Sequence, residues 1–132
     1  MAFFHMPPAE FKEAYEKMKL GDHTVIYEHG SIGEKDEYFG ISNRPPHFFE
    51  KAVDNGWLKW IFCGHDHLNT LSLTYKGIRM TYGMSIDYLG YSGIAKQYIQ
   101  RGATLITRKT NGNIDITMVP LTTVVSTRVR GA

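Results

Sequence analysis

The sequence contains one cysteine, no long apolar run and little net charge, and each shortage excludes a class of protein. Cys63 has no second cysteine to pair with, so no internal disulfide forms, which favours a reducing compartment such as the cytoplasm. No run approaches the roughly 18 apolar residues of a membrane-spanning helix. A net charge of +2 provides no strong basic field for nucleic acid. The 132 residues therefore predict one globular domain without a membrane or nucleic-acid partner.

Turn signals and apolar spacing predict two helices. The first follows the proline pair at 7–8 and ends at Gly21, because proline suits the first helical turn and glycine suits the residue after the last. The second follows the proline pair at 45–46 and ends at Gly56, with Phe48, Phe49 and Val53 expected to face inward.

Short apolar or alternating runs predict strands around these helices. They are expected at 2–5, within 23–29, at 58–63, 70–75, 78–83, 103–109 and 114–119. The fold class is therefore α/β, with a mixed sheet and two helices in one domain over residues 1–120, followed by a tail at 121–132. Because the first strand resembles the end of a core strand, we expect a segment upstream to be missing.

Two histidines separated by one residue follow the strand expected at 58–63. In "FCGHDHLN", Gly64 permits a turn and a close backbone approach to a ligand, and His65 and His67 are candidate ligands of a divalent metal. Asp66 could be a further ligand or could orient an imidazole. The alternative is that both histidines are polar loop residues that only form hydrogen bonds.

His5 ends another apolar strand. Taken alone, a histidine at this place is more often a core or edge residue whose ring forms a hydrogen bond with a backbone carbonyl than a metal ligand. Ligands of open α/β sheets bind beyond the carboxyl ends of the strands, however. His5 therefore becomes a candidate metal ligand together with His65 and His67 at the end of the other strand. For His23, His29 and His47 we expect loop or surface roles.

These segments together resemble a known family. "AFFHMPPAEF", followed about sixty residues later by "FCGHDHLN", is similar to the C-terminal half of calcineurin-like metallophosphoesterases, in the branch related to purple acid phosphatases. "GIRMTYGMSIDYLGY" and "QRGATLI" also look like that branch, so the resemblance spans residues 2–119. It implies half of the four-layer metallophosphoesterase sandwich.

The resemblance also implies a chemistry. The family hydrolyses phosphate esters with a metal-bound hydroxide at a pair of metal ions, for which zinc, iron and manganese are candidates. By motif, His5 and His65 would bind the second metal and His67 the first, with His65 and His67 as the catalytic residues. Asp66 and Asn69 would orient these ligands without binding the metal themselves.

Half of the family's ligand set is absent from the sequence. The family carries Asp-x-His, Gly-Asp and Asn-His upstream of the position of His5. This chain has no Asp-x-His and no Asn-His, and its Gly-Asp at 21–22 follows His5. Three imidazoles alone do not offset the repulsion between two dications. We therefore expect the C-terminal part of a phosphatase or related phosphoesterase, inactive until its N-terminal half completes it.

The alternative is a stand-alone, non-catalytic domain that binds metal or self-associates. The first interpretation implies that the protein, once completed by its N-terminal half, binds a phosphate-ester substrate, whereas the second implies no such substrate. A sheet edge that lacks its natural neighbour would be exposed and apolar, and it predicts a homo-oligomer.

Overall fold

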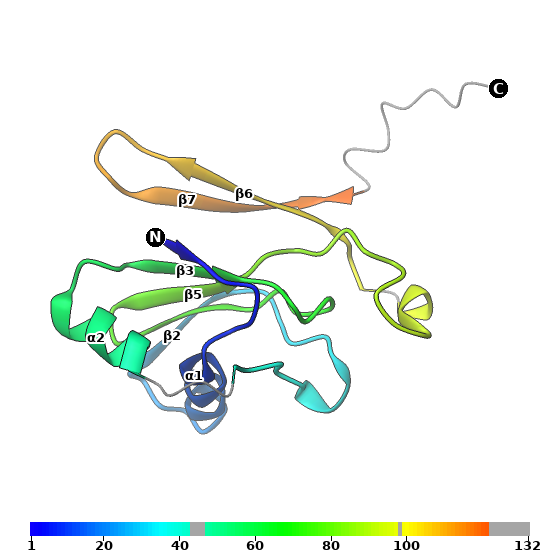
Figure 1. Cartoon of the computed structure of the whole chain (residues 1–132), viewed down its shortest axis with the longest axis horizontal. Helices are drawn as coiled ribbons and strands as arrows, with labels where there is room; N and C mark the ends of the chain where they lie inside the picture. Colours follow the sequence, from blue (N-terminus) through cyan, green and yellow to red (C-terminus); the bar gives the residue numbers. More distant parts are fainter. Residues whose placement is uncertain (43–46, 98, 122–132) are drawn as a thin grey trace. The chain divides into compact units, whose positions relative to one another are not determined.

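The computed structural model describes residues 1–42, 47–97 and 99–121, which form two compact units (Figure 1). The first unit is Met1–Gly83 and the second begins at Met84. The mixed α/β content expected from the sequence is confirmed. The boundary at residue 120 stays a prediction, because most of the expected tail lies outside the described residues.

The first unit contains both helices and five strands. In chain order they are β1 (Ala2–Phe3), α1 (Ala9–Lys19), β2 (Val25–His29), a 3-10 turn η1 (Lys35–Glu37), α2 (His47–Asn55), β3 (Trp60–Cys63), β4 (Ser72–Tyr75) and β5 (Ile78–Tyr82). The sheet order is β1-β3-β5-β4-β2. The pairs β1–β3 and β3–β5 are parallel, whereas β5–β4 and β4–β2 are antiparallel. β1 and β2 are therefore the edge strands of a mixed sheet.

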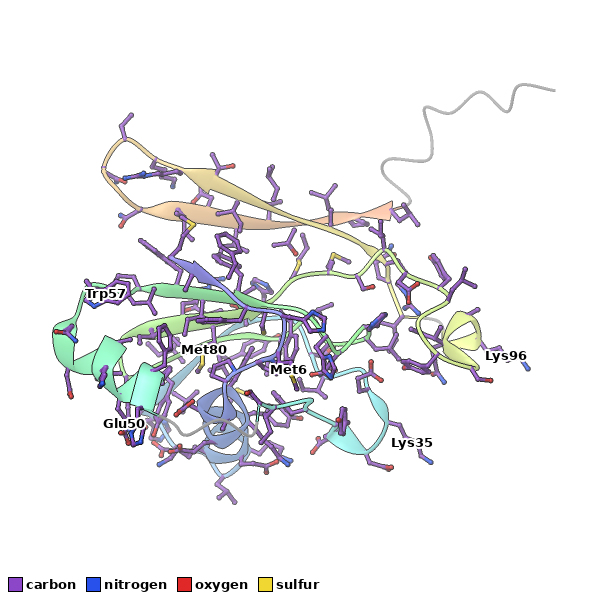
Figure 2. All side chains as sticks on the ribbon, viewed as in Figure 1. Met6, Lys35, Glu50, Trp57, Met80 and Lys96 are labelled. Carbon is purple, nitrogen blue, oxygen red and sulfur yellow. The ribbon has the colours of Figure 1, made fainter. Side chains whose placement is uncertain are left out.

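One face of this sheet packs against both helices (Figure 1). Side chains alternate along a strand, so every second residue of the central strands faces the helices. These residues are Ile61, Cys63, Leu73, Tyr75, Ile78, Met80 and Tyr82, and the helices contribute Phe11, Ala14, Phe49 and Ala52. Met80 lies within this layer and is fully buried (Figure 2). The core thus fixes the strands whose carboxyl ends carry the motif histidines.

The helices begin and end close to the expected places. Pro8 precedes α1 as its N-cap, and Gly21 follows it with a φ of +80°. Gly56, with a φ of +66°, follows α2, whereas the proline pair at 45–46 lies outside the described residues. The inward orientation expected for Phe48 is wrong, because this side chain is 43% exposed. Phe49 faces the core and Val53 packs against it, as expected, whereas Phe48 points away because neighbouring residues of a helix point about 100° apart.

The second unit contains a 3-10 turn, η2 (Ile94–Lys96), and the antiparallel hairpin of β6 (Gly102–Arg108) and β7 (Ile114–Pro120). Gly112, with a φ of +85°, lies in the turn, which confirms the hairpin expected there. None of the helices in the described segments is long and apolar enough to cross a membrane.

Buried Arg101 organises the loop before this hairpin. Its guanidinium donates hydrogen bonds to the backbone carbonyls of Asp87 (2.7 Å), Ile99 (2.7 Å) and Ile94 (3.2 Å). It also lies over the ring of Tyr88, 4.9 Å from the centroid. These bonds satisfy the buried charge, so Arg101 has a structural role.

Candidate functional site

Parallel pairing of β1 with β3 brings two motif histidines to one edge of the sheet. Beyond the strands, the Phe4 amide donates to the Phe62 carbonyl (2.9 Å) and the Gly64 amide donates to the His5 carbonyl (3.0 Å). Because parallel strands end at the same edge, His5 and His65 leave the sheet side by side. Their proximity is a consequence of strand register.

The two imidazoles point nitrogens at each other. Nε2 of His5 lies 3.2 Å from Nδ1 of His65, with ring centroids 5.1 Å apart and ring planes at 82°. Such a distance joins a donor to an acceptor, or it separates two lone pairs directed at one cation. Two nitrogens bound to zinc at about 2.05 Å in tetrahedral geometry lie about 3.3 Å apart. The separation of the two nitrogens therefore matches that of two ligands on one transition-metal ion.

A tight turn centred on His65 sets the direction of its side chain. The Asp66 amide donates to the Gly64 carbonyl at 2.9 Å, and His65 has a φ of +69°. We expected Gly64 to allow the turn, but the left-handed backbone is at His65. This conformation costs a non-glycine residue about 1–2 kcal/mol. It persists only where the surrounding structure imposes it, which is common at functional sites.

The loop after β2 touches the imidazole of His65 at Gly40. A Cβ atom built on Gly40 would lie 2.1 Å from Cδ2 and 2.6 Å from Nε2 of His65, and 2.7 Å from Oδ1 of Asp66. No side chain larger than that of glycine fits in this space without a shift. Gly40 therefore closes one side of His65 while the Nδ1 side faces His5.

Asp66 holds this loop in place. Both of its carboxylate oxygens accept hydrogen bonds from the Gly40 amide (3.1 and 2.9 Å), and Oδ2 also accepts from the Tyr82 hydroxyl at 2.5 Å. Burial and the hydrogen bond to Asp66 raise the pKa of the Tyr82 hydroxyl well above its usual range, so it stays a proton donor. The carboxylate thus acts on His65 through Gly40.

Asn69 fixes the same loop at a second place. It is fully buried, accepts from the amides of Gly33 (3.0 Å) and Glu34 (3.1 Å), and donates to the carbonyl of Tyr38 (3.0 Å). In return, the Glu34 carboxylate accepts from the Leu68 amide at 3.0 Å. Supporting roles for Asp66 and Asn69 at a metal site stay predictions, whereas their contacts with the loop are clear.

The third motif histidine, His67, does not complete a metal cage. Within residues 1–42, 47–97 and 99–121, no three His, Cys, Asp or Glu side chains are grouped so as to hold a metal ion. Alternation along an extended strand would place residues 65 and 67 on one side, but the turn at His65 interrupts it. The structure thus brings together His5 and His65, and the ligand roles of all three histidines stay predictions.

Two residues that position His65 were missed in the sequence. Gly40 lies in an irregular segment that offers no signal for a close contact with a residue 25 positions later. Tyr82 did offer one: it occupies a core-facing position of an expected strand, and a buried tyrosine hydroxyl needs a hydrogen-bond partner.

Comparison with known proteins finds partial similarity to two plant proteins. Over 91 residues, 69% of this chain, it is 28% identical to "Probable inactive purple acid phosphatase 29" of Arabidopsis thaliana. Over 47 residues, 36% of this chain, it is 38% identical to "Probable inactive purple acid phosphatase 14" of the same organism. No protein-family model and no solved structure matches. The chain spans 21% of the length of the first relative and 12% of the second, so each similarity covers only a small part of a protein like the purple acid phosphatases.

Proposed function

We propose that this chain is the C-terminal part of a metal-dependent phosphoesterase domain and does not hydrolyse phosphate esters by itself. The observation that carries the proposal is the 3.2 Å between Nε2 of His5 and Nδ1 of His65, at adjacent strand ends. Partial similarity to purple-acid-phosphatase-like proteins supports a phosphoesterase-related domain. The proposed partners are a phosphate ester and an N-terminal half that supplies the remaining ligands.

The imidazole pair would hold one divalent ion, with His67 reserved for a separate ion. A bound metal ion lowers the pKa of a coordinated water and offsets charge on phosphoryl oxygens. In their neutral forms, His5 and His65 would each offer a nitrogen lone pair. The contacts of Gly40 with His65 and of Asp66 with Gly40 would keep the second ring from turning away.

Zinc titration calorimetry of the chain and its histidine variants tests the pair. His5→Ala and His65→Ala should each weaken binding by more than the roughly 10–100-fold that loss of a supporting hydrogen bond costs. His23→Ala, a change at an exposed histidine, is the matched control and should leave the affinity unchanged. Equal affinities for all four proteins would overturn the pair as a metal site.

A phosphatase assay tests the incomplete site. The purified chain with manganese or zinc should not hydrolyse 4-nitrophenyl phosphate. Co-expression with the upstream half, expected to carry Asp-x-His, Gly-Asp and Asn-His, should produce turnover that His65→Ala abolishes. Sustained turnover by the chain alone would contradict the proposal.

A non-catalytic domain is the second candidate. It is favoured by the absence, in the part of the chain that the structure describes, of a group of three potential ligand side chains. Both relatives are also named inactive. If zinc binding depends on His5 and His65 while the upstream half restores no turnover, this second candidate is the correct one.

A further inference from the structure

A cavity of about 460 Å³ opens beside His5, between the residues that follow β1 and the two helices. Its volume lies within the roughly 300–1,000 Å³ of small-molecule sites. Apolar side chains dominate its lining, with two ionisable groups among them; the residues that matter here are Phe4, His5, Met6, Glu10, Phe48 and Phe49. Met6 is labelled in Figure 2. The size and lining are suited to the hydrocarbon part of a ligand.

Three phenylalanine rings form the apolar wall. Phe49 is 1% exposed, whereas Phe4 and Phe48 are 40% and 43% exposed. The rings of Phe4 and Phe48 meet edge to face, with centroids 5.1 Å apart and planes at 82°. Exposed ring faces attract cations through the negative charge density above the ring, and they also bury hydrocarbon.

Glu10 gives the cavity its charge. This residue is only 8% exposed, and burial is the main cause that raises the pKa of its carboxyl, followed by repulsion from Glu13 and Glu50. A hydrogen bond from its own backbone amide and the charge of Lys76 act in the opposite direction. Glu10 forms no ion pair with any residue that the structure describes. An anion in this cavity would be repelled by the Glu10 carboxylate, whereas a cation would offset the repulsion of Glu10 by Glu13 and Glu50.

The helix that carries Glu10 does not by itself explain this burial. The partial positive charge of the helix N-terminus favours an acidic residue in the first turn of α1, where Pro8 provides no side-chain cap. That attraction also operates on the exposed side of the turn. Burial beside aromatic rings removes hydration from the carboxylate, a cost that a bound cation would offset.

We propose that this cavity binds an ammonium group carried on a hydrocarbon scaffold, with Glu10 as its counter-ion and the rings of Phe4 and Phe48 around it. His5 belongs both to the lining and to the imidazole pair. The bound group would therefore be the alcohol part of the phosphate ester, and this assignment alone rests on the proposed function. Binding of the ammonium group requires neither metal nor catalysis.

Titration of the full chain with benzyltrimethylammonium, without added metal, tests the proposal by two-dimensional NMR. Benzyl alcohol and phenylacetate serve as the neutral and anionic probes of similar hydrocarbon. The ammonium probe should bind at least about tenfold more tightly than benzyl alcohol, which corresponds to one desolvated cation contact, and phenylacetate should bind weakest. Equal binding of the three probes, or no binding of the ammonium probe, would overturn the proposal.

Paired substitutions separate the charge from the aromatic wall. Glu10→Gln should weaken the ammonium probe about tenfold and leave benzyl alcohol within about twofold. Glu50→Gln is the same change at an exposed residue of α2 (Figure 2), and it should have a smaller effect because Glu50 does not line the cavity. Phe48→Ala should weaken both probes, whereas Trp57→Ala, at a 64% exposed ring outside the cavity, should change neither. Thermal unfolding confirms that each variant folds, and an unaltered ammonium affinity in folded Glu10→Gln would contradict the role of the carboxylate.

Discussion

A Cβ atom on Gly40 would lie 2.1 Å from Cδ2 of the His65 imidazole, so the loop after β2 meets the candidate ligand at a place where only glycine fits. Asp66 holds the loop at this contact by accepting hydrogen bonds from the Gly40 amide. The position of His65 therefore depends on a residue 25 positions away, and this dependence can be measured.

Gly40→Ala should displace the loop or the imidazole. The expected loss is about 1–3 kcal/mol in the free energy of unfolding, as for other overpacked sites, together with weaker zinc binding. Gly64→Ala is the matched control, because a Cβ atom there would meet only the His5 carbonyl, at 3.8 Å, and should cost less than about 1 kcal/mol. Chemical denaturation and zinc titration measure both effects, and equal stability of the two variants would contradict the close contact.

Tyr82→Phe should destabilise the loop through Asp66. Removing the hydroxyl leaves a buried carboxylate oxygen short of a donor, which costs about 1–3 kcal/mol. Tyr75→Phe is the comparison, because the Tyr75 hydroxyl donates at 2.8 Å to exposed Glu13, which water can satisfy instead. Denaturant unfolding should rank Tyr82→Phe as the more damaging change. The reverse order would show that the hydrogen bond to Asp66 is not a main support of the loop.

The elements of the fold followed from local signals. The Asn-Gly turn at 111–112 and the alternation around it predicted β6 and β7, and apolar strands ending in histidine predicted the carboxyl ends of β1 and β3. Such signals are local because a turn or an apolar run is specified by neighbouring residues.

The detail of the site depends on contacts between distant segments and could not be predicted in the same way. The contact of Gly40 with His65 and the hydrogen bond of Tyr82 with Asp66 exist only once the sheet has formed. The left-handed backbone of His65 could not be predicted either. With Gly64 next to it, the sequence favours the glycine as the left-handed residue of the turn. Spacing in the sequence indicates which imidazoles can meet, whereas the tertiary structure decides which nitrogens face each other.

His29 ends β2 and has a buried ring nitrogen, so the loop or surface role expected for it is wrong, and it should make the stability of the first unit depend on pH. Nδ1 of His29 lies 3.2 Å from Nη2 of Arg79, and because arginine only donates, Nε2 carries the proton. That Nε2 is buried and has no hydrogen-bond partner among the described residues. Burial, followed by the charge of Arg79, lowers the pKa of His29 below its ordinary 6.5, although Glu28 opposes the shift.

The unfolded chain therefore binds this proton first as the pH falls. The stability that neutral His29 contributes is complete well above 6.5 and is lost as the pH falls through 6.5 towards the lower folded-state pKa. The excess stability of the natural chain over His29→Gln should thus shrink between about pH 7.5 and about pH 5. Urea unfolding at several pH values measures it, and a difference that stays constant or grows on acidification would contradict the expected sign.

Phe3→Lys should reduce self-association of the chain. Phe3 belongs to the edge strand β1, is 63% exposed and stacks on Phe62 with centroids 5.2 Å apart. An exposed aromatic on a sheet edge favours pairing with another copy, and a lysine there opposes it. Ile26→Lys is the matched control, because Ile26 is 58% exposed on β2, the other edge. Sedimentation velocity across a range of concentrations should show oligomers for the natural chain and Ile26→Lys but smaller species for Phe3→Lys. If the natural chain is monomeric at every concentration, β1 is not a self-association edge. If only Ile26→Lys dissociates the oligomers, the contact belongs to β2.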